Sequence, residues 1–274
     1  MTRQVALIGK PLKRRHSQVM HDAAFDACGI DARYVLREID ADEVAGVVAS
    51  ARGAGWLGLG VTAPYKQVVA GLVDEVEGDA LSIGEVNNVM RTDDGRLIGF
   101  NSDAPGFLAG VERALGRPLT GLSVVVAGAG GAAQAVVYAC LAAGAASVVV
   151  GNRTVPAFAG GIPAVALDDS AFRTALEAAD LAVNATTVGM IDPGMTIDVD
   201  ALPDHATVFD LVYVPPETPL LRAARARGLR AANGSEMLIQ QAAIAFERWT
   251  GVAGMADVMR AAVAPLLADA TVTA

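Results

Sequence analysis

A short glycine-rich turn is the stretch of this sequence whose residue types and spacing point most directly to chemistry. The turn consists of Gly128, Ala129, Gly130, Gly131 and Ala132. Gly128 can turn the chain sharply, and Gly130, which has no Cβ, lets a pyrophosphate approach the backbone. The turn follows the apolar run Leu122–Ala127 and precedes a helix-like segment whose first amides would face a phosphate. Strand, turn and helix in this order predict a dinucleotide-binding unit.

The residues after the next predicted strand bear on which dinucleotide is bound. The apolar run Ser147–Val150 leads into Gly151, Asn152, Arg153 and Thr154. A site for NAD usually has Asp or Glu at this strand end, where the carboxylate holds the ribose hydroxyls. Arg153 stands there instead, and a guanidinium can pair with the 2′-phosphate of NADP. The sequence therefore favours NADP, with NAD as the open alternative.

Two charged side chains lie close to the ends of predicted strands. Lys66 follows the apolar run Trp56–Val61, and functional groups in open α/β sheets gather at the carboxyl ends of strands. Asp103 follows a predicted hairpin with an Asp94-Gly95 turn. Each also has a purely structural interpretation, Lys66 as a surface residue on a first helical turn and Asp103 as a helix N-cap. Spacing alone leaves both interpretations open.

The first hundred residues alternate between strand and helix patterns. Short apolar or alternating runs predict strands, and helix-like segments closed by glycine lie between them. We expect Ser17 to be the N-cap of the first helix, which would run to about Cys28. The other predicted elements are Val5–Ile8, Arg33–Ile39, Trp56–Val61, Val89–Arg91 and Leu97–Phe100 as strands and Ala41–Arg52 as a helix. This order is typical of parallel βαβ units followed by a hairpin.

Beyond the hairpin, a helix leads into the dinucleotide unit, and the chain ends in longer helices. Predicted elements here are the helices Pro105–Leu115, Leu220–Arg227, 237–249 and Met255–Ala264 and the strands Leu181–Ala185 and Thr207–Val212. Pro265 should kink or end the last helix. The chain as a whole therefore reads as an α/β protein.

Composition and charge exclude several classes of function. The chain has 274 residues, 53% of them hydrophobic, which is enough for one or two domains with a substantial core. A formal net charge of −9 argues against nucleic acid as the partner, because nucleic-acid phosphates need a basic face. The uncharged stretch between Arg117 and Arg153 is divided by glycines, so we expect no membrane span, which needs about 20 apolar residues in one helix.

The cysteines and histidines show no pattern of metal ligands. Cys28 and Cys140 lie in apolar helical contexts, and this usage, with no secretory signal at the N-terminus, predicts a reduced cytoplasmic protein. The histidines His16, His21 and His205 are scattered, so we expect no metal site. We expect His16 and His21 to lie on a helix surface.

Eight short motifs follow one another along almost the whole chain. They are Val61–Lys66, Glu85–Asn88, Gly99–Asp103, Gly128–Ala133, Asn152–Thr154, Asn184–Gly189, Asp210–Leu220 and Gly234–Gln241. In this order they resemble VTxPxK, AVNT, GxNTD, GAGGAA, NRT, NATxxG, DxxYxxxxTPL and GxxMLxxQ. These motifs belong to the shikimate dehydrogenase family and its quinate-type relatives, which the chain therefore resembles.

The resemblance implies a fold, a reaction and a substrate class. The fold would have a substrate domain, residues 1–104, with a mostly parallel sheet, completed by C-terminal helices in 236–274. A Rossmann-type, doubly wound NADP-binding domain, 105–235, would lie between these parts in the sequence. The reaction would be the reversible reduction of a 3-dehydroshikimate-like ketone by hydride transfer, a step of aromatic amino acid biosynthesis. The partner would be a small anionic cyclic hydroxy acid, and the protein a monomer or homodimer.

The resemblance also implies residue roles. Lys66 and Asp103 match the catalytic pair: a carbonyl that accepts hydride develops alkoxide charge, which an ammonium can stabilise and protonate while the carboxylate positions the lysine. Substrate contacts would come from Arg15, Ser17, Thr62, Asn87 and Gln241. Cofactor contacts would come from Gly128, Ala129, Gly130, Gly131, Ala132, Asn152, Arg153, Thr154, Thr186, Val212 and Gly234.

Departures from the family pattern fall mostly where the substrate would bind. The family's first motif, G-N-P-I followed by S-x-S, holds the substrate carboxylate with two hydroxyls. This chain has Lys10 for the Asn, Arg15 for the first Ser, and Ser17 for the second. Arg15 can grip a carboxylate bidentately, or it can fill the pocket and select another acid. Other departures are Gly60 for Asn, Asn88 for Thr, Asn233 for Asp, and Ala157 where a second basic residue is expected.

Three hypotheses follow. The first is an NADP-linked shikimate dehydrogenase or close paralogue. The second is a quinate or aminoshikimate type dehydrogenase with altered substrate, linked to NAD or NADP. The third is a non-catalytic protein that binds NADP or a metabolite. Retention of both Lys66 and Asp103 argues against the third, because a pure binder needs no acid–base pair.

Overall fold

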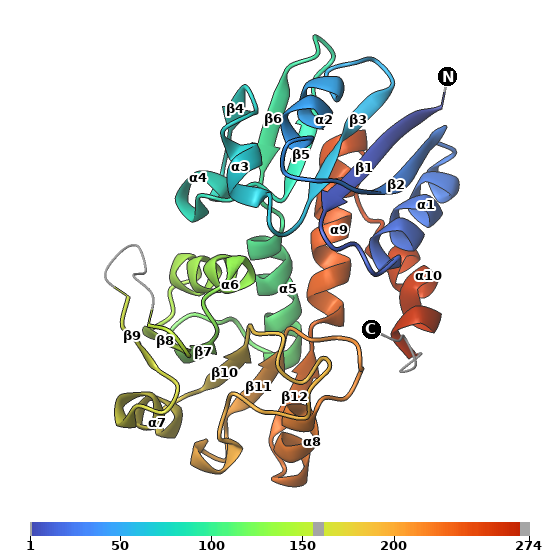
Figure 1. The fold of residues 1–274 in the computed structure, drawn as a ribbon. Helices are drawn as coiled ribbons and strands as arrows, with labels where there is room; N and C mark the ends of the chain where they lie inside the picture. Colours follow the sequence, from blue (N-terminus) through green and yellow to red (C-terminus); the bar gives the residue numbers. More distant parts are fainter. Residues whose placement is uncertain (1, 156–161, 269–274) are drawn as a thin grey trace. The chain divides into compact units, whose positions relative to one another are not determined.

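The structure is a computed structural model that describes residues 2–155 and 162–268 (Figure 1). The chain forms two compact units, each built on its own six-stranded sheet. Of the described residues, the first unit contains 2–103 and Ile239–Leu266, and the second contains those of Ala104–Leu238 together with 267–268. The boundaries fall at the start of helix α5 (Asp103–Leu115) and inside helix α9 (Ser235–Thr250).

The first unit has a mixed sheet with the strand order β2-β1-β3-β5-β6-β4. Its strands are β1 (Arg3–Gly9), β2 (Ala32–Glu38), β3 (Trp56–Val61), β4 (Glu75–Val76), β5 (Asn88–Arg91) and β6 (Leu97–Phe100). Strand β1 pairs in parallel with β2 and β3, whereas β5 is antiparallel to both β3 and β6. The predicted βαβ units and hairpin are therefore present in one sheet.

Helices cover both faces of this sheet. They are α1 (His16–Cys28), α2 (Val44–Ser50), α3 (Lys66–Ala70), α4 (Asp79–Ile83), the 239–250 part of α9, and α10 (Ala256–Ala268). Val47 of α2 and Val69 of α3 pack with Ile8 and Leu59 of the sheet in one apolar core. On the other face, the rings of Phe25 of α1 and Phe246 of α9 are in contact, tilted by 49° with centroids 5.1 Å apart.

The second unit has an all-parallel sheet with the order β12-β11-β10-β7-β8-β9. Its strands are β7 (Ser123–Ala127), β8 (Ser147–Asn152), β9 (Ala164–Ala166), β10 (Leu181–Asn184), β11 (Thr207–Asp210) and β12 (Arg230–Asn233). Numbered along the chain and read from the β9 edge, this is the order 3-2-1-4-5-6 of dinucleotide-binding sheets. The strand order reverses between β7 and β10, which is where such sheets bind their ligands.

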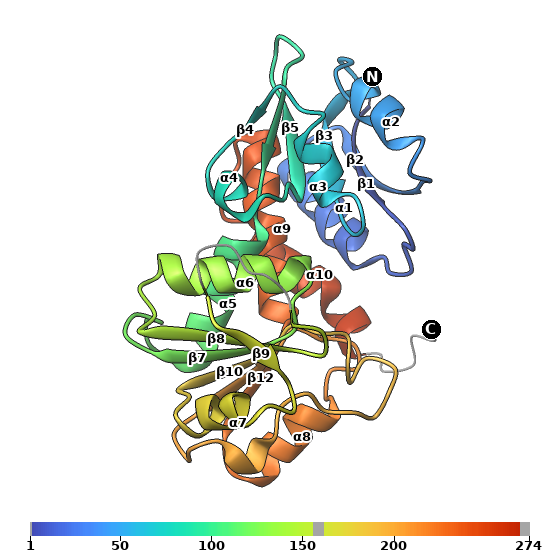
Figure 2. The same ribbon diagram turned by 60° about the vertical axis from the view of Figure 1, so that its left-hand side comes forward.

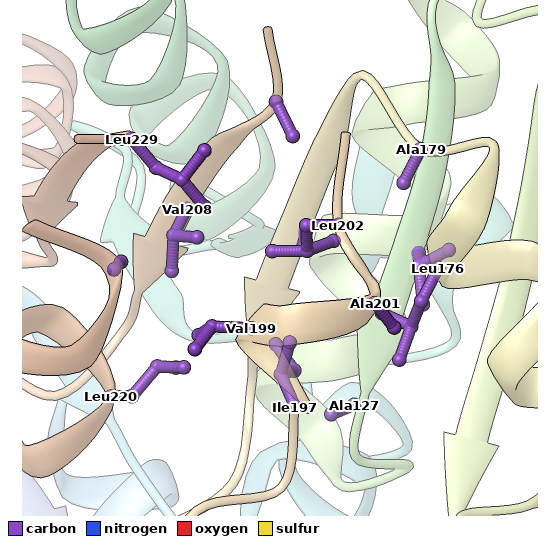
Figure 3. Close-up of a cluster of buried hydrophobic side chains, with 14 of the residues drawn as sticks. Ala127, Leu176, Ala179, Ile197, Val199, Ala201, Leu202, Val208, Leu220 and Leu229 are labelled. Carbon is purple, nitrogen blue, oxygen red and sulfur yellow. The ribbon is translucent and has the colours of Figure 1, made fainter. Parts of the chain in front are cut away.

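Helices lie on both faces of the second sheet as well. Helices α5 and α6 (Gly131–Ala142) lie on one face, and α7 (Ser170–Glu177) and α8 (Pro219–Ala226) on the other, near the short 3₁₀ helix η2 (Val199–Ala201) (Figure 2). Figure 3 shows the apolar cluster on the α7 and α8 side, which contains Leu176 of α7, Leu220 of α8 and Val208 of the sheet. Burial on both faces explains the continuous Val run of β7.

The structure differs from the sequence-based expectations at some helix ends. Ser17 is not the N-cap of α1: Arg15 is, and Ser17 lies inside the first turn. Pro265 does not end α10, which continues to Ala268. The sequence analysis predicted neither β9, α7 nor β12. No helix in the described ranges is both long and apolar enough to cross a membrane.

Candidate active site

Lys66 and Asp103 form a close ion pair in the first unit. Lys66 begins α3, just after strand β3, and Asp103 begins α5, just after strand β6. Lys66 Nζ donates to Asp103 Oδ2 at 2.6 Å, and each side chain is only 15% exposed. The interpretation of Lys66 as an ordinary surface residue is therefore wrong. Asn101 Oδ1 accepts a hydrogen bond from the Asp103 backbone N–H at 2.9 Å and so orders the start of α5.

The charges around Lys66 keep it protonated. Burial acts to lower the pKa of Lys66, but the charge and the hydrogen bond of Asp103, together with the charge of Glu85, outweigh burial and raise the pKa. Glu85 is itself buried, and its Oε2 has no hydrogen-bond partner among the described residues. At neutral pH the site therefore presents an ammonium group that can donate a proton.

Two of the predicted substrate-binding amides meet near this pair. Asn87 Nδ2 donates to Ser102 Oγ at 3.2 Å, and Ser102 Oγ lies 3.4 Å from Gln241 Oε1. Ser102 directly precedes Asp103, and Asn87 directly precedes β5. Asn87, Ser102 and Gln241 therefore come from three segments but lie within one hydrogen-bonded group, and Asp103 follows Ser102 in the chain. The sequence analysis assigned no role to Ser102, which connects the two amides.

The residues predicted to hold a carboxylate lie at the start of α1. Arg15 is exposed, and its Nε donates to Gln18 Oε1 at 3.1 Å. Ser17, two residues further on, is half-buried. Lys10, which replaces the family's Asn, forms an ion pair with Asp40. Thr62 is half-buried at the end of β3, where its backbone N–H donates to Ile8 O at 2.9 Å.

Gly60, which replaces the family's Asn, lies against the side chain of Tyr34. A Cβ at Gly60 would lie 2.6 Å from the hydroxyl of Tyr34, so Tyr34 occupies the space that a side chain would need. His21 stacks on Tyr34 with ring centroids 4.5 Å apart. The expectation that His16 and His21 lie on the helix surface was wrong, because both are buried. His16 and His21 belong to the buried face of α1.

The glycine-rich turn of the second unit leaves room for a ligand. Gly128 has φ +118°, and a Cβ there would lie 2.9 Å from the carbonyl of Ala185, so only glycine fits. A Cβ at Gly130 would meet no described atom within 4 Å. Gly130 is the N-cap of α6, and no side chain caps the helix. The first amides of α6 are therefore open to an anion, which fits the pyrophosphate of a dinucleotide.

The segment after β8 carries the guanidinium of Arg153. Arg153 is exposed and has no carboxylate partner within the described part of the chain. Asn152 Nδ2 donates to Thr154 O at 2.8 Å and shapes the turn that presents Arg153. This arrangement can bind a phosphate on a ribose. Ala157 lies outside the described residues.

Thr186 and Val212 belong to a buried polar network that the sequence analysis missed. Asn184 and Asp210 are neighbours at the ends of β10 and β11, and Asn184 Nδ2 donates to Asp210 Oδ1 at 2.8 Å. Thr186 Oγ1 donates to Asn184 Oδ1 at 2.7 Å, and Val212 N donates to Asp210 Oδ1 at 3.0 Å. The network thus fixes both loops that border the turn. The sequence feature that could have indicated this network is the pair of polar residues, Asn184 and Asp210, at the ends of two apolar strands.

Gly234 and Asp210 show how tightly these loops are built. A Cβ at Gly234 would lie 2.3 Å from the carbonyl oxygen of Leu211, so the two backbones approach closely only because residue 234 is glycine. Burial raises the pKa of Asp210, against the opposing effect of its hydrogen bonds from Thr218, Val212 and Asn184.

No group of three or more His, Cys, Asp or Glu suited to a metal occurs in the described ranges.

Two family models match the chain. The shikimate dehydrogenase substrate binding domain matches residues 7–89, and the shikimate 5′-dehydrogenase C-terminal domain matches residues 234–264. The first covers Lys66 and Asn87, and the second covers Gln241. Both matches lie on segments that supply the polar groups of the first unit.

Relatives and solved structures extend the match to nearly the whole chain. Shikimate dehydrogenase (NADP(+)) of Geobacter sulfurreducens is 37% identical over an alignment of 275 residues that covers 95% of each chain. A shikimate 5-dehydrogenase from Thermus thermophilus, in complex with NADP(H) and shikimate, is 37% identical with a TM-score of 0.83, covering 95% of this chain and 99% of that one. Quinate dehydrogenase from Corynebacterium glutamicum, in complex with NAD, is 33% identical with a TM-score of 0.89, covering 96% and 99%. Sequence identity and coverage at this level show that the chain belongs to the shikimate dehydrogenase family.

Proposed function

We propose that this protein is an NADP-dependent oxidoreductase that interconverts 3-dehydroshikimate and shikimate, or a close cyclic hydroxy acid. The observation that carries the proposal is the 2.6 Å pair of Lys66 and Asp103 in a chain of this family. A partly exposed ammonium beside a carboxylate suits the proton transfer that accompanies hydride transfer to a ketone.

The pair accounts for the acid–base part of the reaction. In the reducing direction the ketone oxygen gains negative charge, and the Lys66 ammonium stabilises that charge and donates a proton to the oxygen. In the oxidising direction Lys66, in its neutral form, accepts the proton from the alcohol. Asp103 holds Lys66 Nζ in place at 2.6 Å and keeps it protonated between turnovers.

Other residues of the first unit would hold the acid. Asn87 and Gln241, which are joined through Ser102, would bind ring hydroxyls. Arg15 and Ser17 at the start of α1 would bind the carboxylate, and Thr62 would lie beside the ring. A guanidinium is a stronger carboxylate ligand than the serine hydroxyl of the family pattern, because its hydrogen bonds are charge-assisted.

The second unit would hold the cofactor. NADP(H) supplies or accepts the hydride when it is bound. The Gly128–Ala132 turn and the open start of α6 would hold its pyrophosphate. Arg153, with Asn152 and Thr154, would bind the 2′-phosphate, and the loops that carry Thr186, Val212 and Gly234 would border the rest. Both cysteines are free thiols, which supports a reducing compartment such as the cytoplasm.

The test is turnover followed at the absorbance band of reduced nicotinamide, with shikimate and quinate each paired with NADP and NAD. We expect shikimate with NADP to give the highest kcat/KM. Lys66→Ala should lower kcat by about 10²–10⁴-fold, as is typical for loss of a general acid, while NADP binding stays near the wild-type value. Lys13→Ala, at an exposed lysine, is the matched control. Undiminished turnover by Lys66→Ala would contradict the assignment.

A quinate-type activity is the second candidate. Arg15 in place of the family's first serine favours it, because the change alters the predicted carboxylate site. Higher kcat/KM for quinate than for shikimate would select this candidate while leaving the roles of Lys66 and Asp103 unchanged. Binding of NADP without turnover of any cyclic acid would instead select the non-catalytic alternative.

A further inference from the structure

Asn88 is buried beside Asn87 and joins it to Ser102. Asn88 Nδ2 donates hydrogen bonds to Asn87 Oδ1 and to Ser102 Oγ, both at 2.8 Å. All three side chains are buried. The family pattern has Thr where this chain has Asn88, so this pair of hydrogen bonds depends on a residue particular to this sequence.

The backbone of Ser102 decides which atom of Asn87 is the oxygen. A backbone N–H can only donate, and Ser102 N lies 2.8 Å from Asn87 Oδ1. The Asn87 atom at this position is therefore an acceptor, and Asn88 must approach it with its nitrogen. Asn87 Oδ1 accepts two hydrogen bonds in this way, which occupies both of its lone pairs.

With its oxygen occupied, Asn87 can offer a ligand only an N–H group. One Nδ2 hydrogen is directed to Ser102 Oγ at 3.2 Å, and an amide nitrogen has a second. Ser102 Oγ accepts from both amides, so its own hydrogen is directed to Gln241 Oε1 at 3.4 Å. The same network thus orients the second amide that is predicted to contact the substrate.

We propose that Asn88 is a positioning residue for the substrate, which holds the Asn87 carboxamide so that only an N–H faces a ring oxygen. The identity of that oxygen, a ring hydroxyl, rests on the proposed function. A threonine at residue 88 cannot donate both of these hydrogen bonds, because a hydroxyl has one hydrogen whereas the Asn88 amide supplies two. Asn88 acts through Asn87 and does not itself contact the substrate.

Two substitutions at residue 88 test this role, with crystal structures as the first measurement. Asn88→Leu removes both hydrogens with little change of size, and Asn88→Thr keeps one. In Asn88→Leu we expect the Asn87 carboxamide to turn and to lose its hydrogen bond with Ser102 N, because its oxygen is left half-satisfied in a buried position. In Asn88→Thr that hydrogen bond should remain.

Steady-state kinetics with shikimate and NADP is the second measurement. We expect the KM for shikimate to rise about tenfold in Asn88→Leu and about threefold in Asn88→Thr, with kcat and the Kd of NADP near wild type. Thr92→Ala is the matched control, because Thr92 Oγ1 bonds Arg96 O in the same hairpin, at 3.1 Å, and has no hydrogen bond to Asn87. Its KM should not change.

The outcomes separate this proposal from the proposed function. An unchanged Ser102–Asn87 hydrogen bond in Asn88→Leu, or a loss of kcat at constant KM, would overturn the role of Asn88. If Asn88→Leu does not fold, the graded KM of Asn88→Thr decides alone, and a wild-type KM would overturn the role. If the wild type turns over neither shikimate nor quinate, the proposed function fails, while the crystal structures still decide how Asn87 is held.

Discussion

The charge state of Lys66 is set by the residues around it. Burial of the ammonium would by itself favour the neutral amine, but the carboxylate of Asp103 and the more weakly acting charge of Glu85 reverse this effect and raise its pKa. A lysine with a raised pKa stays protonated to higher pH, and the ammonium is lost as the pH rises through that pKa. Ketone reduction, which needs the ammonium, should therefore persist into alkaline solution.

Glu85→Gln should move the alkaline limit of ketone reduction to lower pH. The substitution removes one of the negative charges that raise the pKa of Lys66 and keeps an acceptor for Gln67, whose Nε2 lies 3.3 Å from Glu85 Oε1. The measurement is the pH dependence of kcat/KM for reduction. Glu75→Gln is the control, since Glu75 is exposed and paired with Arg96. Identical pH profiles for the wild type and Glu85→Gln would show that Glu85 has no influence on Lys66.

Arg15→Ser restores the family pattern at the predicted carboxylate site. Because Arg15 is exposed and its side chain donates a hydrogen bond to the exposed end of Gln18 on the same helical turn, the guanidinium can turn to a ligand at little cost. We expect the KM for shikimate to rise about tenfold, from the loss of a charge-assisted hydrogen bond. Kinetics with shikimate and quinate measures the effect. A lower KM for shikimate would mean instead that Arg15 excludes this acid.

At the scale of elements, helix α1 is held by aromatic contacts. His21 stacks on Tyr34 of β2, and its ring also meets Trp249 of α9 at 5.1 Å between centroids. His21 Nδ1 is buried and has no hydrogen-bond partner among the described residues. Burial lowers the pKa of His21 to about 3, so the ring is neutral in the folded protein at any moderate pH.

His21→Phe should make the first unit more resistant to acid. Between pH 6.5 and about 3 the unfolded chain takes up a proton at His21 that the folded chain does not, so stability is lost as the pH falls through this window. Relative to the variant, the wild type should lose about 2 kcal/mol of unfolding free energy between pH 7.5 and 5. Urea unfolding followed by tryptophan fluorescence reports this, since Trp56 and Trp249 both belong to the first unit.

The exposed His205 provides the control for this measurement. Its side chain is 64% exposed, so His205→Phe makes the same substitution without removing a buried imidazole. Parallel stability curves for the wild type and His21→Phe would mean that His21 is protonated in the folded protein.

At the scale of the whole molecule, the residues predicted to hold the two ligands belong to different units. The predicted acid-binding residues and the Lys66–Asp103 pair belong to the first unit, whereas the glycine turn and Arg153 belong to the second. Substitutions in groups that share no partner usually have additive effects on free energy. A substitution in one of these two sets should therefore have little effect on the binding constant of the ligand predicted for the other.

Arg153→Ala should weaken NADP binding by about 1–3 kcal/mol and leave NAD binding and the KM for shikimate nearly unchanged. The reason is that only NADP carries a 2′-phosphate for the guanidinium. Titration calorimetry with each cofactor measures the difference. Equal losses for NADP and NAD would show that Arg153 does not bind the 2′-phosphate.

The local sequence by itself determined most of the helices and strands. It also determined which residues follow the strand ends, where the candidate site residues lie. The strand, the glycine turn and the helix at 122–143 follow from apolar runs and from Gly128, whose backbone conformation only glycine adopts readily. The order of the βαβ units, and the place of Lys66 after β3, follow in the same way. Short-range preferences suffice here, because each depends on neighbours within a few residues.

Tertiary structure alone decided how distant residues combine. Lys66 and Asp103 are 37 positions apart, and no local pattern shows that they form an ion pair. The burial of His21 against Tyr34, and the donor-only orientation of Asn87, depend on side chains brought together from several elements. Such contacts form only when the sheets and helices pack, and the polar groups they bury must then find partners, which fixes orientations that the sequence leaves open.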